Sequence, residues 1–292
     1  MERQENRELR GAGINSSSSI TGRTLLFTVS IFLIVICAAG LLADIIALAD
    51  PLEQNARYRL QPPSWDNYFG TDGLGRDVFS RVIYASRTSL YIAFLSILIA
   101  GPLGVLIGTI SGYLGGLLDI IVQRLVDVVL AFPMLVLVLI ICIALGTSAT
   151  SIAVAISIAQ TPHIIRLSRG CTVKVTNETY LEAATVLGGN ALWIIKSHVL
   201  PNTLPIVLPQ ITGYFGIALV AEASMSFLGL GVQAPYPSWG GMIEDGALNY
   251  FEIAPWTTIF PGLALGLTTL SLGIIGDSVT DMIDRNHHIV AN

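Results

Sequence analysis

The stretch YLEAATVLGGNALWIIKSHVLPN, from Tyr180 to Asn202, lies between two highly apolar parts of a highly apolar chain. It holds a carboxylate, two adjacent glycines, a lysine and a histidine, so the apolar pattern is interrupted here. Strong helix formers occupy Tyr180–Leu187, and Gly188-Gly189 permits a sharp turn after them. Ala191–Leu200 predicts a second helix, which Pro201 stops. The stretch therefore predicts a helix–turn–helix.

The composition around this stretch indicates a membrane protein. Hydrophobic residues make up 53% of the chain and charged residues 12%, which is far from the usual range of a soluble domain. A length of 292 residues fits about six spans of roughly 20 residues with their connections. No basic face for nucleic acid is present in the sequence. We therefore expect an all-α, polytopic membrane protein whose partner is the lipid bilayer.

Uncharged runs predict six spans. They are Leu25–Ala43, a span within Thr88–Leu118, two spans within Val128–Ile165 that separate at Gly146-Thr147-Ser148 with the second ending near Pro162 and Arg166, a span within Leu204–Leu230, and Ile253–Gly276. A cleaved signal peptide is the alternative for the first run, because Arg23 precedes it and Ala47-Leu48-Ala49 resembles a cleavage site. The run exceeds the roughly 7–15 residues of a signal h-region, which favours a retained span.

The distribution of Lys and Arg predicts the orientation. Basic residues occur in the N-terminal tail, after the fourth span and in the C-terminal tail: Arg3, Arg7, Arg10, Arg23, Arg166, Arg169, Lys174, Lys196 and Arg285. The external segment Asp50–Arg87 is an exception, but its arginines are balanced by acidic residues. We expect both termini and the Tyr180–Asn202 stretch to be cytoplasmic.

Two interpretations of the helix–turn–helix follow from its residues alone. Ala183 and Ala184 give the first helix a thin flank that fits a groove on another protein, and Glu182 offers a charge to a cation there. The alternative is an amphipathic helix that rests on the lipid surface. Composition does not separate the two.

The same residues resemble a known family. Glu182-Ala183-Ala184, Gly188 and His198-Val199-Leu200-Pro201 are similar to the EAA loop of permease subunits of bacterial ABC importers. The general pattern has Ile at the position of His198, and HVLPN resembles the form in the dipeptide, oligopeptide and nickel permease branch. Three further segments resemble that branch, in the same order: Phe69–Ala93, Arg124–Pro133 and Met225–Gly246. The similarity covers Pro62–Asp281, and it departs from the branch at Thr280 and Arg285.

The resemblance implies a type I ABC importer permease fold with six transmembrane helices. It implies a cytoplasmic tail at 1–23, a first transmembrane helix with an external segment at 24–87, a permease core at 88–280 and a cytoplasmic tail at 281–292. The coupling loop would lie at 168–203 within the core. Its ATPase-coupling residues would be Glu182, Ala183, Ala184, Gly188, His198, Leu200 and Pro201.

The resemblance also implies partners: a second homologous permease, two cytoplasmic ATPase subunits that bind ATP and Mg, and an extracytoplasmic solute-binding protein. We do not expect the chain itself to be an enzyme or to bind a cofactor. Its two lysines, Lys174 and Lys196, follow Val and Ile, whereas a P-loop needs Gly-Lys-Ser/Thr. Di- and oligopeptides are the expected cargo, with nickel or metallophores, glutathione and some sugars as alternatives. The expected location is the cytoplasmic membrane of a prokaryote.

Intramembrane ionisable residues are functional candidates by default. Arg124 and Asp127 are three residues apart, which predicts an intrahelical pair at a membrane boundary. Glu222 lies inside the fifth span, where it is expected to be paired or to face the pathway. The four histidines do not form a convincing metal site.

Two other classes remain for comparison. A proton-coupled secondary transporter would use Asp127, Glu222 and Asp277 as relay groups, but it predicts inverted repeats and broken helices, and the sequence shows no convincing repeat. A purely structural membrane-assembly protein would leave the resembling motifs unexplained. As an importer, the chain would work by alternating access, with bends at Pro162, Pro205 and Pro209.

Overall fold

The computed structural model describes the backbone of residues 24–290 and the side chains of residues 24–281. The elements are a helix over Thr24–Leu41, α2 (Ala43–Ile46), η1 (Ala56–Tyr58), α3 (Val78–Leu114), α4 (Gly116–Leu130), α5 (Met134–Leu145), α6 (Ala149–Thr176), α7 (Thr179–Val186), α8 (Ala191–Ile194), η2 (Ile195–Val199), α9 (Leu200–Phe227), α10 (Trp239–Asn249) and α11 (Trp256–Val290). Within the described range, an isolated β-bridge joins Thr71 and Asp77 and there is no strand. The predicted tail at 1–23 and the side chains of Arg285, His287 and His288 lie outside the described residues.

The predicted all-α membrane fold is confirmed. Among the described residues, four helices are long and apolar enough to cross a membrane: Thr24–Leu41, α3, the continuous helix Ala191–Phe227 and α11. The pair α4 and α5 forms a fifth candidate, bent by 87° at its break. α6 is not among these candidates. It lies between its neighbours in the bundle, with much of its length buried, so it does not need an apolar surface all round.

α3 and α6 form the centre of the bundle, and three glycines bring them together. Gly104, Gly108 and Gly112 lie four residues apart on α3, the small-xxx-small spacing typical of close helix contacts in membranes. A Cβ on Gly104 would lie 2.6 Å from the side chain of Ile164, and one on Gly108 would lie 2.5 Å from the carbonyl oxygen of Ile165. The absence of side chains at these positions therefore sets the distance between the two helices.

The helix that contains the second predicted span extends beyond the uncharged run, and the predicted start of the third span was wrong. α3 begins at Val78 because Asp77 accepts a hydrogen bond of 2.7 Å from the Ser80 amide and caps the helix. Gly115 turns the chain at φ +63°, and α4 begins at once. The third span was expected to start at Val128, but the helix starts twelve residues earlier and carries Asp119, Arg124 and Asp127 on its surface.

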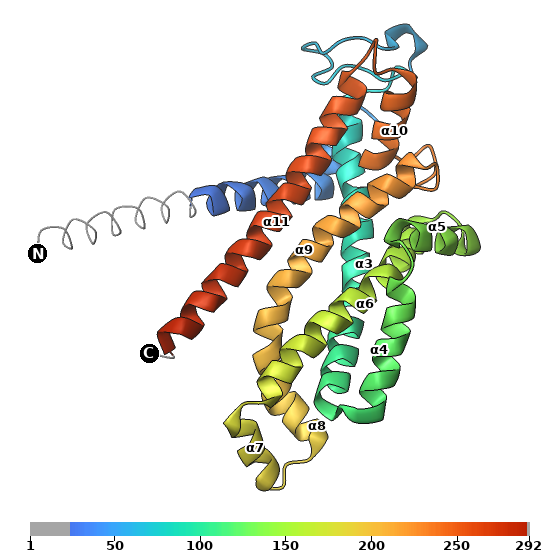
Figure 1. Cartoon of the computed structure of the whole chain (residues 1–292). Helices are drawn as coiled ribbons and strands as arrows, with labels where there is room; N and C mark the ends of the chain where they lie inside the picture. The colour runs from blue at the N-terminus through green and yellow to red at the C-terminus, as the bar shows by residue number, and fades with distance from the viewer. Residues whose placement is uncertain (1–23, 291–292) are drawn as a thin grey trace, which may run out of the picture.

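The fourth and fifth spans are also longer than predicted. α6 does not end near Pro162 but continues to Thr176, with this proline inside the helix. Pro201 does not stop a helix either, since α8, η2 and α9 form one helix over Ala191–Phe227. η2 is a π-helical segment, and its wider turn lies directly ahead of the proline, which cannot donate a backbone hydrogen bond. α9 curves along its length (Figure 1), and Pro205 and Pro209 lie inside it.

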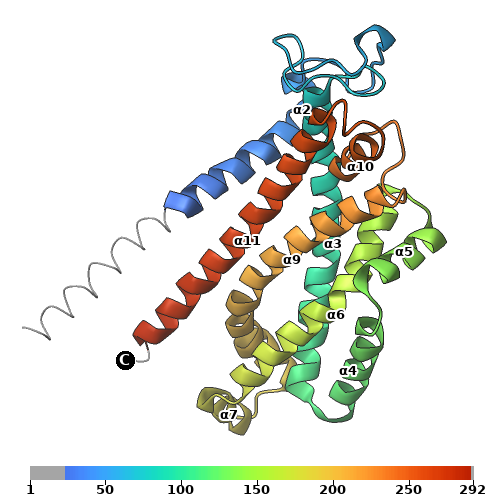
Figure 2. The same cartoon turned by 45° about the horizontal axis from the view of Figure 1, so that its top comes forward.

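Different elements lie at the two ends of the bundle. α7 and α8 lie at one end, and α10 lies with the 50–77 segment at the opposite end (Figures 1 and 2). α10 was not predicted; its first residue, Trp239, is fully buried, and its indole N–H donates to the Val82 carbonyl at 3.0 Å. The Thr24–Leu41 helix is tied to α3 by Arg87, which donates to the carbonyls of Gly40 and Leu41.

Candidate coupling loop and ionisable sites

The predicted helix–turn–helix is formed by α7, a tight turn and α8. Gly188 adopts φ +87°, a left-handed conformation that favours glycine, and its amide donates to the Thr185 carbonyl at 3.0 Å. Asn190 then caps α8, because its side-chain oxygen accepts a hydrogen bond of 2.8 Å from the Trp193 amide. The turn therefore depends on a glycine at 188, as the sequence predicted.

The inner side of this loop is anchored to the bundle. Leu181 of α7 and Ile194 of α8 are almost fully buried, and they form one apolar cluster with Val175 and Val199. Tyr113, near the end of α3, packs against the same cluster. The loop is thus packed against α3, α6 and the start of the long helix.

The outer side of the loop is open. Glu182 and Ala183 are exposed, and Ala184 is half-buried. Three aliphatic side chains project at the tip, with exposed fractions of 82% for Val186, 88% for Leu187 and 81% for Leu192. This tip, defined here as Val186, Leu187 and Leu192, combines with the Glu182 carboxylate to form a small apolar surface beside one negative charge.

Three other predicted loop residues do not lie on that outer surface. The His198 ring packs edge-on against Trp193, with centroids 4.8 Å apart, and lies 6.3 Å from the Tyr180 ring. Its Nε2 is enclosed and has no partner among the described protein atoms. Leu200 is half-buried and lines an apolar groove, while Pro201 is exposed in the first turn of α9. His198 therefore holds the first and second helices of the loop together.

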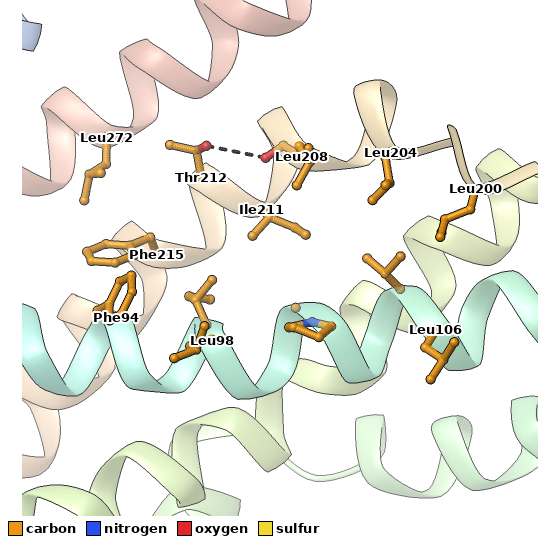
Figure 3. Close-up of a pocket in the computed structure, with 14 residues that line it drawn as sticks. Phe94, Leu98, Leu106, Leu200, Leu204, Leu208, Ile211, Thr212, Phe215 and Leu272 are labelled. Atoms are coloured by element: carbon orange, nitrogen blue, oxygen red, sulfur yellow. Dashed lines mark hydrogen bonds between the residues drawn. The ribbon is translucent and has the colours of Figure 1, made fainter. Parts of the chain in front are cut away.

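The groove that Leu200 lines runs between α3 and α9 and has a volume of about 860 Å³. Figure 3 shows Phe94 and Phe215 facing each other at one end of it, with Leu272 of α11 above them. Thr212 is the one residue of the lining with a polar side chain, and its hydroxyl hydrogen-bonds to the Leu208 carbonyl. This groove has no free polar group to offer a charged solute.

Glu222 lies at the opposite end of the long helix and is fully buried where α9 meets α10 and α3. Ser226 Oγ donates to its Oε1 at 3.0 Å, and Ser238 Oγ lies 3.3 Å from Ser226 Oγ. Ser89 of α3 accepts a hydrogen bond of 3.2 Å from the amide of Trp239 in the same junction. Glu222 Oε1 thus accepts from a hydroxyl group rather than from a cation, and its Oε2 is buried without a partner among the described protein atoms.

The 50–87 segment contains an ionic cluster that the sequence analysis did not identify. Arg76 Nε donates to Asp72 Oδ2 at 2.6 Å, and Arg81 Nε lies 3.4 Å from the same oxygen. All three side chains are buried. Arg81 also donates to the Pro51 carbonyl at 3.0 Å, so the cluster joins the start of the segment to the start of α3. Part of the charge of the 50–87 segment is thus compensated locally, by two arginines around Asp72.

Nearby, Asp44 of α2 accepts hydrogen bonds of 2.8 Å from Tyr84 and 3.0 Å from Arg87. The Arg87 hydrogen bond, followed by that of Tyr84, holds the pKa of the Asp44 carboxyl below its usual value. The charged form of Asp44 is therefore favoured at the start of the 50–77 segment.

The predicted ion pair of Arg124 and Asp127 is present, but Asp127 makes a shorter ion pair with another arginine. Arg124 lies 3.8 Å from Asp127 on α4, whereas Arg166 of α6 lies 2.5 Å from the same carboxylate. A second pair, Asp119 and Arg169, joins the same two helices at 2.5 Å. These contacts between helices could not be predicted from the spacing of residues within one helix.

Comparison with known proteins places this geometry in a family. Residues 104–288 match the family described as binding-protein-dependent transport system inner membrane component. The dipeptide transport system permease protein DppC of Alkalihalophilus pseudofirmus is 38% identical over 84% of this chain and 80% of its own. The probable D,D-dipeptide transport system permease protein DdpC of Escherichia coli is 36% identical over 91% of this chain and 89% of its own.

Other similar proteins extend the comparison. The glutathione transport system permease protein GsiD of Pectobacterium atrosepticum is 35% identical over 76% of this chain and 73% of its own. Among solved structures, an inward-facing MetNI methionine ABC transporter matches with a TM-score of 0.55 at 16% identity, covering 70% of this chain and 96% of that one. The second comparison concerns the fold alone.

Proposed function

This chain belongs to the binding-protein-dependent transport system inner membrane component family and is the permease subunit of an ABC importer, and we propose that its cargo is di- and oligopeptides. The proposed cargo is supported by relatives that are named as dipeptide permeases. They match most of this chain at 34–38% identity. Glutathione is the second candidate, because one relative of 35% identity is named for it.

The chain is a multi-pass membrane protein, and its finer placement is part of the proposal. We infer that it crosses the cytoplasmic membrane of a prokaryote six times, with both termini and the α7–α8 loop in the cytoplasm. The candidate spans support this placement, and Lys174 and Lys196, near or in the loop, support the orientation; Arg166 and Arg169 lie within α6 in ion pairs and do not count toward it. A cysteine at Asn190 should then react with an impermeant thiol reagent from the cytoplasmic side, and one at Tyr236 from the outside; the reverse pattern would contradict it.

The proposed assembly contains a second permease, two ATPases that bind ATP and Mg, and a solute-binding protein. The exposed Glu182 side chain and the aliphatic tip support docking of the loop on an ATPase. In a groove of that subunit, Glu182 would pair with a cation and the tip would be buried. At the other end, Trp65 of the external segment and Tyr236 near α10 are exposed aromatic residues suited to a protein partner.

The long helix supports a mechanism that connects these ends. Ala191–Phe227 begins in the loop and ends at the junction with α10, a length on the order of 55 Å at 1.5 Å per residue. Movement of the loop upon ATP binding would therefore reach the outer end through one continuous element. This supports alternating access driven from the cytoplasmic side.

Reconstitution tests the proposed function. The complete importer in proteoliposomes should take up a dipeptide when ATP is inside, whereas this chain alone should neither hydrolyse ATP nor respond to a proton gradient. Excess glutathione should compete weakly with the dipeptide. Proton-driven uptake by the isolated chain would favour a secondary transporter, for which the break between α4 and α5 is the one suggestive feature.

A further inference from the structure

The two ion pairs between α4 and α6 have the same chemistry but different surroundings. In the inner pair, 14% of the Asp119 side chain and 35% of the Arg169 side chain are exposed. In the outer pair the exposed fractions are 44% for Asp127 and 52% for Arg166. Arg124, next to Asp127, is 81% exposed. The outer pair and Arg124 thus form a charged surface, whereas the inner pair is largely enclosed.

This charged surface lies within the bent pair of α4 and α5, one of the candidate membrane spans. Asp127 is about 17 Å along α4 from Gly116 at 1.5 Å per residue, and the hydrocarbon core is about 30 Å thick. Aliphatic residues precede and follow the charges on the same helix, as expected for an element of a spanning pair. Arg and Asp side chains at this depth are costly against lipid and almost always face a water-filled cavity or a protein interior. If this part of α4 lies in the bilayer, the Arg124–Asp127–Arg166 surface is expected to face water or protein rather than lipid.

A cavity of about 420 Å³ adjoins the charged surface where α4 and α5 separate. Its walls include the apolar side chains of Phe132, Met134 and Leu137. Arg166 and His163 of α6 contribute the ionisable groups. A space with apolar walls and a few polar groups at one side is the usual form of a small-molecule site.

We propose that the Arg124–Asp127–Arg166 surface lines the solute passage and binds the charged ends of a zwitterionic short peptide. This inference rests on the proposed cargo. Arg166 would bind the peptide carboxylate in the manner typical of guanidinium groups, and Asp127 would bind the ammonium group. In the absence of peptide the two side chains neutralise each other, so exchange of partners leaves no charge uncompensated.

The matched pair provides the test in the complete importer. Asp127→Asn should lower peptide uptake per ATP hydrolysed roughly tenfold or more, since a charged hydrogen bond to the solute is lost. Asp119→Asn removes the same charge from the same helix, and it should leave this ratio at the wild-type value even if less complex is recovered. The wild-type importer must take up peptide in the same assay, which confirms the importer function. If Asp127→Asn then keeps the wild-type uptake per ATP hydrolysed, the inference about this surface is wrong.

A second experiment measures whether the Arg124–Asp127–Arg166 surface is in contact with water, and it leaves the Asp127–Arg166 ion pair intact. Val128 follows Asp127, and 61% of its surface is exposed. In a background with Cys37, Cys142 and Cys171 replaced by Ala, Val128→Cys should react with a charged thiol reagent faster than Ile34→Cys, which is 67% exposed on the N-terminal helix. Equal or slower reaction of Val128→Cys in the assembled importer would show that the surface is not in contact with water and would overturn the proposal.

Discussion

His198 lies between Tyr180 and Trp193, and its ring packs edge-on against Trp193 at a centroid distance of 4.8 Å. Trp193 and His198 belong to the same continuous helix, and the Tyr180 ring, 6.3 Å from His198, brings the start of α7 to this contact. An aromatic pair of this kind contributes about 0.5–1.5 kcal/mol beyond its buried area. The loop is therefore a preformed unit, and its outer residues are held in place by its inner ones.

The first prediction concerns this contact. His198→Ala should loosen α7 from α8 and increase cleavage of the loop by protease in everted vesicles. His198→Phe keeps an aromatic ring and should restore protection. If the Phe variant is cleaved as readily as the Ala variant, the imidazole nitrogens matter more than the ring contact, and the packing explanation is wrong.

The second prediction concerns the turn. A Cβ at Gly188 would meet no atom within 4 Å, so Gly188→Ala acts only through the left-handed backbone and should destabilise the turn by about 1–2 kcal/mol. Gly170 of α6 is equally free of contacts but has helical geometry, so Gly170→Ala should be neutral or stabilising. Loop protection from protease measures both. Equal behaviour of the two variants would contradict the role of φ.

The third prediction concerns the α3–α6 contact. Gly108→Ala should destabilise the permease by about 1–3 kcal/mol, because the new methyl group would lie against the rigid Ile165 carbonyl. Gly266→Ala in α11 meets nothing within 4 Å and serves as the control. The thermal unfolding midpoint in detergent should fall for Gly108→Ala alone, and a wild-type midpoint would show that the helices are not closely packed at this point.

The fourth prediction concerns Glu222, which is buried without a cation partner among the described residues. An ionised carboxylate would be costly in this position, so a neutral side chain of the same shape should be accepted. Glu222→Gln should retain the wild-type unfolding midpoint. Glu222→Ala removes the acceptor of the Ser226 hydroxyl and leaves a cavity, with an expected loss of about 1–3 kcal/mol. A severe loss in the Gln variant would indicate that the charge itself is needed.

The sequence predicted the features that depend on local rules. Gly188 marks the turn because of its backbone, and the apolar composition indicates the membrane class. The limits of α4 and α6 were missed because uncharged runs were taken as span limits, whereas Asp119, Asp127, Arg166 and Arg169 neutralise one another between these two helices. These partners are about 40–50 residues apart, and no local pattern connects them.

Two other features show what the sequence could and could not predict. The continuity of the helix through Pro201 depends on the π-helical segment, which residue propensities do not predict. In contrast, the Gly104, Gly108 and Gly112 spacing was available in the sequence and would have predicted a close helix contact. The role of His198 required the structure, because its neighbours come from both helices of the loop.

The central claim is that the α7–α8 loop couples this permease to its ATPases. Glu182→Ala tests it most directly, with Lys196→Ala as the control, since Lys196 is an exposed charge in the same loop but outside α7. The measurement is dipeptide uptake per ATP hydrolysed by the complete importer in proteoliposomes, together with the amount of ATPase that co-purifies. Loss of a charged hydrogen bond, about 1–3 kcal/mol, should weaken ATPase association or lower the uptake ratio in Glu182→Ala only. Wild-type values of both quantities in Glu182→Ala would contradict the claim and would favour a helix that rests on the lipid surface.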